Sequence, residues 1–381
     1  MQPIKLKSVE FGGVKVNDVK SWGFAAITDE QGATATVEFP GAEVARRANA
    51  IAEAILSLSG LAIEDESKIE SLLKIDRARI QTDGVVRSVV GALRTAVIEL
   101  QCQHASIGMT EALGARPRGR VQLYANLNRY LRDVLKRRTP KDFGQAAERA
   151  VEAGFRHLKT DPFDEMGQAR SADDVLDAAS VGFERLAAMR SSAGPDVALL
   201  VDCHGGFDVD TAPLVAKELA ELGVIFFEDP VPQRDENVDD LGKIAQQVTI
   251  PVVAGGSTYG EEAFDNLVKH GGVSIIMPDV QRCGGVAVAS MAARAAAESG
   301  VRTSCHSPFG PLSLLASAHV QASTPASFPL EHAVFENEWR ADLVEPRERV
   351  EDGYFWFPGG NGLGAMLNWD AIERHGRRWR V

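Results

Sequence analysis

The sequence predicts a (β/α)8 barrel with a smaller α+β capping domain at its N-terminus. From about residue 121 onward, eight short runs rich in β-branched residues alternate with longer segments of helical periodicity. The alternating region spans residues 121–345, close to the roughly 250 residues typical of this fold. A doubly wound open sheet would normally place a GxGxxG loop after its first strand, and no such loop follows residue 125. The barrel is therefore the favoured architecture.

Each predicted strand is short and is followed by an amphipathic stretch. The predicted strands are Val121–Ala125, His157–Thr160, Ala198–Asp202, Val224–Glu228, Val252–Ala254, Ser274–Met277, Arg302–Cys305 and Pro329–Ala333. The predicted helices include Lys141–Ala153, Ala172–Arg190, Ala212–Leu222, Gly260–Lys269, Val286–Ser299 and Leu312–Ala322. Several of these helices end near a glycine, as helix C-termini often do.

The first 120 residues follow a different pattern. Three alternating stretches predict a small antiparallel meander, and three helical stretches follow it. They are Ile4–Val16, Ser21–Thr28 and Thr34–Glu38, then Ala42–Leu58, Glu64–Ile75 and Gly84–His104. We therefore expect a capping domain over residues 1–120, joined by the C-terminal tail 346–381, and a barrel over residues 121–345.

Composition restricts the possible partners. The chain has 381 residues, 41 Lys and Arg against 53 Asp and Glu, and a formal net charge of −12. Nucleic-acid binding needs clustered cations to neutralise phosphates, so we expect no nucleic-acid partner. We interpret the basic stretch Arg129–Arg138 as a solvated helix face. No apolar run of about 18 residues and no signal-peptide core occurs, which predicts no membrane partner and a cytoplasmic location.

The ends of the predicted strands carry most of the candidate chemistry. In a barrel the carboxyl ends of all strands meet at one face, where catalytic groups lie. The residues at these ends are Lys159 and Asp161, Asp202 and His204, Glu228, Gly255 and Gly256, Asp279, His306, and Glu331. Their joint placement predicts one polar site.

Residue type suggests roles within that site. Asp202 and Glu228 end adjacent strands, so their carboxylates can converge on a hard cation such as Mg²⁺. Asp279 ends the strand beside that of His306, and a carboxylate bonded to one imidazole nitrogen raises the basicity of the ring. This pair could remove a carbon-bound proton. His204 shares a face with Asp202 and can reach a substrate held on the metal.

Six segments resemble the enolase superfamily and, within it, the mandelate racemase-like acid-sugar dehydratases. They are Phe155–Phe163, Val201–Gly205, Phe226–Pro230, Pro278–Asp279 with Gly284–Gly285, Cys305–Pro311, and Glu331. The resemblance covers essentially the whole chain, because the N-terminal part is similar to the capping domain of that family.

The resemblance implies a first step in which a base removes the proton α to the carboxylate of a substrate bound to Mg²⁺. Carried over by position, the His306–Asp279 pair would be the base. His204 would be the acid that helps the 3-hydroxyl leave as water. Glu331 would hydrogen-bond the developing enediolate or the substrate carboxylate, and Lys159 would lie beside that carboxylate.

The sequence departs from the family pattern at two positions. Members often carry Lys-x-Lys at the second strand end, where this chain has Lys159-Thr160-Asp161. Aspartate is a poor second base, so the change favours dehydration over racemisation, and Asp161 is expected to bind a substrate hydroxyl. The third metal carboxylate normally ends the fifth strand, where this chain has Gly256. Either two carboxylates with waters hold Mg²⁺, or Ser257 or Asp279 replaces the ligand, or the site is metal-poor.

The expected activity is a Mg²⁺-dependent lyase that dehydrates an aldonate-like acid to its 2-keto-3-deoxy product. A racemase or epimerase of an α-substituted carboxylate is one alternative, and a catalytically altered acid-binding relative is another. Specificity is expected from Gly12–Trp22 and the region near Ala42–Ala54, with Asn126, Asn128 and Trp339 contributing side chains. The resemblance also implies a homo-oligomer.

Overall fold

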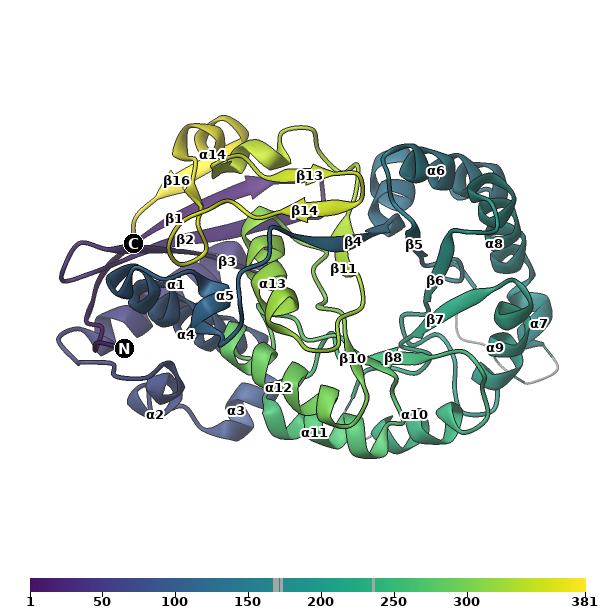
Figure 1. Ribbon diagram of the computed structural model, residues 1–381, viewed down its shortest axis with the longest axis horizontal. Helices are drawn as coiled ribbons and strands as arrows, with labels where there is room; N and C mark the ends of the chain where they lie inside the picture. The colour runs from purple at the N-terminus through teal and green to yellow at the C-terminus, as the bar shows by residue number, and fades with distance from the viewer. Residues whose placement is uncertain (167–170, 172–173, 235–236) are drawn as a thin grey trace.

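The computed structural model describes residues 1–166, 171, 174–234 and 237–381, and it contains the predicted barrel (Figure 1). The eight parallel strands are β4 (Arg120–Asn126), β5 (His157–Thr160), β6 (Ala198–Asp202), β7 (Val224–Glu228), β8 (Val252–Ala254), β9 (Ile275–Ile276), β10 (Arg302–Thr303) and β11 (Leu330–Ala333). Strands β4 to β10 pair in chain order, and β11 pairs with β4. A parallel bridge between Thr303 and Ser327 completes the ring.

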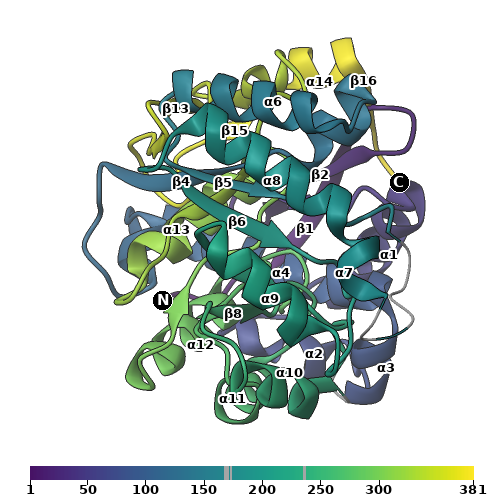
Figure 2. The same cartoon turned by 90° about the vertical axis from the view of Figure 1, so that its right-hand side faces the viewer.

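Helices cover the outside of these strands (Figures 1 and 2). They are α6 (Pro140–Glu152), α7 (Val175–Ala178), α8 (Ser180–Ala193), α9 (Ala212–Glu221), α10 (Val238–Ala245), α11 (Glu261–His270), α12 (Val286–Glu298) and α13 (Pro311–Ser323). The helix predicted over Ala172–Arg190 is divided into α7 and α8, and its first two residues lie outside the described residues. None of the helices in the described residues has both the length and the apolar composition needed to cross a bilayer.

Side-chain alternation along the strands separates two cores. Leu200 and Phe226 belong to a cluster inside the barrel, whereas Val201 and Phe227 belong to the cluster between strands and helices. Successive side chains in a strand point to opposite faces, so the period of two continues to the strand ends. The alternation that directs Leu200 inward therefore also directs Asp202, two residues later, toward the mouth of the barrel.

An antiparallel sheet forms the N-terminal part of the molecule. Its strands, in the order β16-β1-β2-β3, are β16 (Gly376–Trp379), β1 (Leu6–Lys15), β2 (Ser21–Asp29) and β3 (Thr34–Phe39). The helical segments of this part are α1 (Val44–Leu58), η1 (Glu66–Lys68), α2 (Ile69–Leu72), α3 (Arg77–Thr82), α4 (Gly84–Ala105) and α5 (Met109–Ala112). An apolar core lies between the sheet and helices α1 and α4.

The C-terminal tail contacts both parts of the molecule. Its elements are η4 (Arg340–Leu343), β12 (Val344–Glu345), β13 (Arg349–Glu351), β14 (Tyr354–Trp356), β15 (Met366–Leu367) and α14 (Trp369–His375), ahead of β16. Strand β14 pairs with barrel strand β4, and β16 pairs with β1, so the first and last strands of the chain lie side by side (Figure 1). The division at residues 120 and 345 stays a prediction.

Glu38 links the N-terminal sheet to the barrel. Its buried carboxylate accepts hydrogen bonds from the backbone N–H groups of Gly310 at 2.7 Å and Ser313 at 3.0 Å, at the start of α13. The Gln281 side chain donates a third bond at 3.2 Å. A carboxylate at a helix N-terminus satisfies unpaired N–H groups and interacts favourably with the helix dipole. This contact fixes the sheet beside the carboxyl ends of the barrel strands.

Candidate active site

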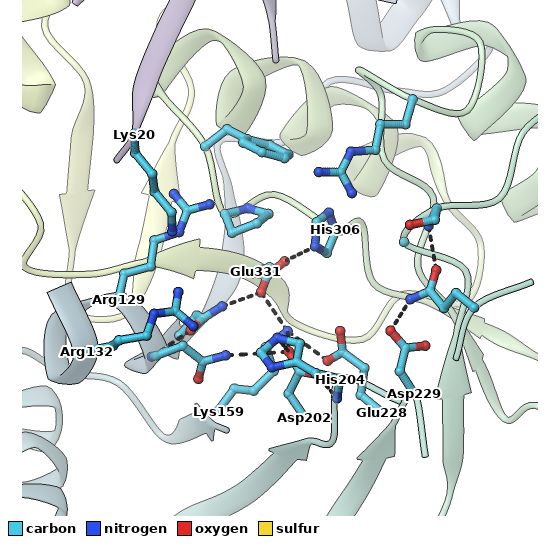
Figure 3. Close-up of a pocket in the computed structure, with 18 residues that line it drawn as sticks. Lys20, Arg129, Arg132, Lys159, Asp202, His204, Glu228, Asp229, His306 and Glu331 are labelled. Carbon is cyan, nitrogen blue, oxygen red and sulfur yellow. Dashed lines mark hydrogen bonds and ion pairs between the residues drawn. The ribbon is translucent and has the colours of Figure 1, made fainter. Parts of the chain in front are cut away.

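A cavity of about 270 Å³ opens at the carboxyl ends of the barrel strands (Figure 3). Its lining includes eight of the residues that the sequence predicted for the site or its metal. These are Asn126, Lys159, Asp202, His204, Glu228, Gly256, His306 and Glu331. Lys20, from the turn between β1 and β2, also lines the cavity, which is therefore shared between the barrel and the N-terminal sheet.

The Lys159 ammonium lies among three carboxylates at the floor of this cavity. Its Nζ atom is 2.7 Å from Glu228 Oε2, 2.7 Å from Glu331 Oε1 and 3.7 Å from Asp202 Oδ2. All four side chains are buried, and they project from β5, β6, β7 and β11. Asn126 donates a further bond of 2.7 Å to Glu331. A buried ammonium is tolerated only when carboxylates compensate its lost hydration, and this cluster supplies that compensation.

The cluster changes the titration of its members. Burial disfavours the charged form of Lys159, but the adjacent Glu228 and Glu331 carboxylates outweigh this effect and raise the lysine pKa. Burial would likewise raise the pKa of Glu331, but the charges of Lys159 and His306 outweigh it and lower that pKa to about 2. Lys159 is therefore a permanent cation, and Glu331 is a carboxylate at neutral pH.

His306 and Asp279 form the pair that the sequence predicted. His306 Nδ1 lies 3.0 Å from Asp279 Oδ2, and His306 Nε2 lies 4.0 Å from Glu331 Oε2. The backbone N–H of Gln281 donates to Asp279 Oδ1 at 2.9 Å, which fixes the carboxylate. Because Asp279 accepts a hydrogen bond from the Nδ1–H group, the Nε2 atom is left as the unprotonated nitrogen that faces the cavity. This arrangement suits a general base.

His204 forms a second pair, with a residue that the sequence did not identify. Its Nδ1 atom lies 2.7 Å from Asp164 Oδ1, and its Nε2 atom lies 3.1 Å from Asp202 Oδ2. Burial disfavours the imidazolium, but hydrogen bonds to the two carboxylates raise the pKa of His204 to about 11. The ring is therefore held as a proton donor. His204 follows strand β6 and His306 follows strand β10. These strands are four apart in a ring of eight, so the two imidazoles approach from opposite sides (Figure 3).

Four cations that the sequence did not assign to the site line its rim. They are Lys20, Arg129, Arg132 and Arg282. The interpretation of Arg129–Arg138 as a solvated helix face holds for Arg132, Lys136 and Arg137, which are exposed, but is wrong for Arg129 and Arg138. Only 12% of the Arg129 side chain and 12% of the Arg138 side chain is exposed; they flank the π-helical segment η2 (Tyr130–Leu135) and pair with Glu336 and Asp161. Tertiary packing brings these cations to the cavity, so sequence patterns alone did not identify them. Lys20 does fall within Gly12–Trp22, the stretch predicted to contribute to specificity.

The remaining predicted substrate contacts have different surroundings. Asn128 lines the cavity and donates to Asp202 Oδ2 at 3.5 Å. Asp161 is fully buried and pairs with Arg138 at 3.0 Å, so it is not among the lining residues. Trp339 stacks on His375 with ring centroids 4.5 Å apart, also away from the lining. No residue of Ala42–Ala54 lines the described cavity. Substrate contacts by Asp161 and Trp339 therefore stay predictions.

The carboxylates at the mouth fit a Mg²⁺ ion. Asp202 and Glu228 are register partners in the β6–β7 pair, so the structure brings the two predicted ligands together. One carboxylate oxygen from each of three residues, Asp202, Glu228 and Asp229, lies within 4.8 Å of the other two oxygens. Mg²⁺ prefers carboxylate oxygens and keeps several waters, so three such groups suffice. A second acidic group of possible metal ligands lies nearby: one oxygen each of Asp161 and Asp164 and a ring nitrogen of His204 are also within 4.8 Å of one another.

Comparison with known proteins identifies the class. Residues 142–371 match the family described as enolase C-terminal domain-like, and the chain belongs to that family. A solved member of the enolase superfamily from Salmonella Typhimurium superposes with a TM-score of 0.86 at 19% identity, over 99% of this chain and all of that one. This similarity confirms the predicted barrel with an N-terminal capping domain.

Two curated relatives extend the comparison. The D-xylonate dehydratase of Haloferax volcanii is 27% identical over 77% of this chain and 70% of its own length. The D-gluconate dehydratase of Thermoproteus tenax is 27% identical over 76% of this chain, and the match spans 56% of its own length. Both are dehydratases, and the prediction of an enzyme of the lyase class is confirmed.

Proposed function

We propose that this protein is a Mg²⁺-dependent dehydratase of an acid sugar, which converts an aldonate-like acid to a 2-keto-3-deoxy acid. One observation carries the proposal: two imidazoles, each bonded to an aspartate, face one cavity from opposite sides. The names of the two relatives support the acid-sugar class. Dehydration needs a base at one carbon and an acid at the next, and these pairs can fill the two roles.

The cavity is suited to a small polyhydroxy acid. Its lining is rich in charged and amide side chains, and the rim cations favour an anionic ligand over a neutral one. Asn126 and Asn128 offer amides that can reach substrate hydroxyls. Mg²⁺, when bound, would supply positive charge beside the substrate carboxylate. Asp202 and Glu228 are the proposed residues that hold it.

The two histidines then divide the proton transfers. His306 Nε2 takes the proton from the carbon α to the carboxylate, and the imidazolium that forms is stabilised by Asp279. The bond between C3 and its hydroxyl breaks, and His204 gives its proton to the leaving oxygen, which departs as water. The resulting enol takes up one proton at C3 and loses its hydroxyl proton at C2, which gives the 2-keto-3-deoxy acid. His306 then releases its proton to solvent, and His204 regains one. Atoms and charge balance without an oxidant or reductant.

A racemase or epimerase is the second candidate, because His204 also approaches from the side opposite to His306. Inversion requires each base to exist in an unprotonated form during one direction of the reaction. Both ring nitrogens of His204 face carboxylates, from Asp164 and Asp202, which stabilises its imidazolium. This environment favours a proton donor, and hence dehydration.

A substrate screen tests the proposal. The metal-free protein, prepared with a chelator, is incubated with a panel of aldonates with and without added Mg²⁺, and 2-keto acids are measured. We expect one or a few acids to yield product only when Mg²⁺ is present. Ligand-induced thermal stabilisation by an acid without any product would instead support the acid-binding relative. The homo-oligomer and the cytoplasmic location stay predictions; sedimentation of the purified protein tests the oligomer.

A further inference from the structure

We propose that Asp229 supplies the third metal carboxylate that position 256 lacks, so that Mg²⁺ is held by Asp202, Glu228 and Asp229. The inference deepens the proposed function and rests on it for the identity of the metal. The replacement is the residue directly after strand β7, next to a predicted ligand, rather than a residue at the end of β8. It differs from the two replacements expected from the sequence, Ser257 and Asp279.

Two side chains restrict the space beside Gly256. A Cβ atom at this position would lie 3.2 Å from His306 Cδ2 and 3.5 Å from Gln233 Nε2. Gln233 Oε1 accepts a hydrogen bond of 2.6 Å from the backbone N–H of Ser257, and its Nε2 donates to Asp229 Oδ2. The Gln233 amide thus occupies the region beside Gly256 and connects the end of β8 to Asp229. A longer side chain at 256 would compete with this amide and with the imidazole of the base.

Asp229 has an oxygen available for a ligand. The residue is 7% exposed and lines the cavity. Its Oδ1 atom is buried and has no hydrogen-bond partner among the described residues, whereas Oδ2 is held by Gln233. A buried carboxylate oxygen without a partner is costly, because it loses its hydration without compensation. A cation bound by Asp202, Glu228 and Asp229 would remove that cost.

The other two carboxylates keep capacity for a cation. The Lys159 ammonium donates to one carboxylate oxygen of Glu228, Oε2. Asp202 Oδ1 accepts a hydrogen bond from the backbone N–H of His204, at 3.1 Å, while Lys159 and His204 Nε2 approach Oδ2. Lys159 and the His204 imidazolium supply two positive charges beside the four carboxyl groups of Asp202, Glu228, Asp229 and Glu331, so a divalent cation would complete the charge balance.

The competing positions are already neutralised. Asp279 is bonded to His306, to Arg282 at 3.3 Å and to the Gln281 N–H, which leaves it engaged with the base. In the second acidic group, Asp161 is paired with the guanidinium groups of Arg138 and Arg132. These two ion pairs engage both carboxylate oxygens of Asp161, whereas Lys159 bonds Oε2 of Glu228.

Titration calorimetry of the chelator-treated, full-length protein with MgCl2 tests the proposal without any substrate. We expect Asp229→Asn to weaken Mg²⁺ binding by more than about 100-fold, because outer partners of metal ligands alone are worth roughly 10- to 100-fold. Gln233→Ala, which removes the side chain that positions Asp229, should weaken binding by about 10-fold. Asp164→Asn is the matched control, because it makes the same change in the second acidic group, and we expect wild-type affinity.

Wild-type affinity in Asp229→Asn would overturn the proposal, and so would a loss confined to Asp164→Asn. Because Asp229→Asn could fail to fold, Mn²⁺-soaked crystals of the wild-type protein provide a second measurement. The anomalous peak should lie about 2.1 Å from one oxygen of each of the three carboxylates, allowing for the slightly larger ion. A peak that Asp229 does not contact would contradict the inference. Failure of the proposed function is distinct: the metal would bind at this site, yet no acid sugar would be dehydrated.

Discussion

Asp164 Oδ1 lies 2.7 Å from Nδ1 of His204. The contact repeats, on the other side of the cavity, the 3.0 Å contact between Asp279 and His306. The environments differ at the second nitrogen, because His204 Nε2 is 3.1 Å from Asp202 while His306 Nε2 is 4.0 Å from Glu331. Asp164 is therefore a positioning residue for the proposed acid, as Asp279 is for the proposed base.

Asp164→Asn should impair elimination more than proton abstraction. The amide cannot stabilise the imidazolium of His204, so we expect the turnover number to fall by about 10- to 100-fold, a typical effect of losing an orienting partner. Exchange of the substrate α-proton with solvent should persist, because His306 and Asp279 are unchanged. Steady-state kinetics and proton NMR in deuterated buffer measure the two rates. Equal loss of both rates would contradict the division of roles.

His306→Asn should abolish both reactions. Asparagine keeps a polar side chain of similar reach but cannot accept the α-proton, and loss of a general base typically costs about 10²- to 10⁴-fold in rate. The thermal unfolding temperature should stay near that of the wild type, because His306 is a partly exposed side chain at the cavity. Retained α-proton exchange in the variant would refute the assignment of the base.

Lys159→Met should destabilise the folded protein strongly. The substitution leaves Glu228 and Glu331 buried without their cation, and breaking a buried pair in this way costs about 3–5 kcal/mol. Urea unfolding followed by circular dichroism measures the change. Lys269→Met is the control, because Lys269 pairs with Asp265 at the surface and such pairs contribute about 1 kcal/mol or less. Similar losses in both variants would show that the Lys159 cluster contributes no special stability.

His319 should make stability depend on pH. It is buried on α13, where Nδ1 faces the Thr110 hydroxyl at 2.7 Å and Nε2 faces the Leu363 carbonyl at 3.1 Å. Burial lowers the pKa of His319 from 6.5 to about 4. Below pH 6.5 the unfolded chain therefore binds a proton that the folded chain does not. As the pH is lowered from 6.5 to 4, protonation of His319 in the unfolded chain should therefore reduce the free energy of unfolding by up to about 3 kcal/mol.

Urea titrations at several pH values compare the wild type with His319→Gln. The variant should lose this part of the acid sensitivity, since glutamine does not titrate. An identical pH dependence in both proteins would rule out His319 as its source.

Much of the barrel could be predicted because strand periodicity is local. The predicted bounds of β5, β6, β7 and β8 agree with the structure to the residue. Helix α10 was not predicted, in part because Gly242 interrupts its apolar pattern. A Cβ atom at Gly242 would lie 2.3 Å from the His270 carbonyl oxygen, so the glycine serves close packing against the end of α11. A requirement set by a distant residue leaves no local signal in the sequence.

In the site, too, residues set by local sequence patterns could be predicted, whereas residues set by tertiary packing could not. Residues at strand ends, such as Lys159 and Glu331, could be predicted because barrel geometry brings all strand ends together. Asp164 and Lys20 lie in loops, whose paths depend on packing. Asp164 was missed, and Lys20 was predicted only as part of the stretch Gly12–Trp22. Asp229 could have been identified from the sequence, because it directly follows Glu228 and places a second carboxylate at the end of that strand.

One measurement tests the central proposal most directly: proton NMR of the purified enzyme with Mg²⁺ and its acid-sugar substrate in deuterated water. The account predicts a 2-keto-3-deoxy product with one solvent deuterium at C3, formed in wild-type protein and absent in His306→Asn. Deuterium at the α-carbon of recovered acid, or an inverted epimer, with no loss of water would contradict it and identify a racemase or epimerase instead.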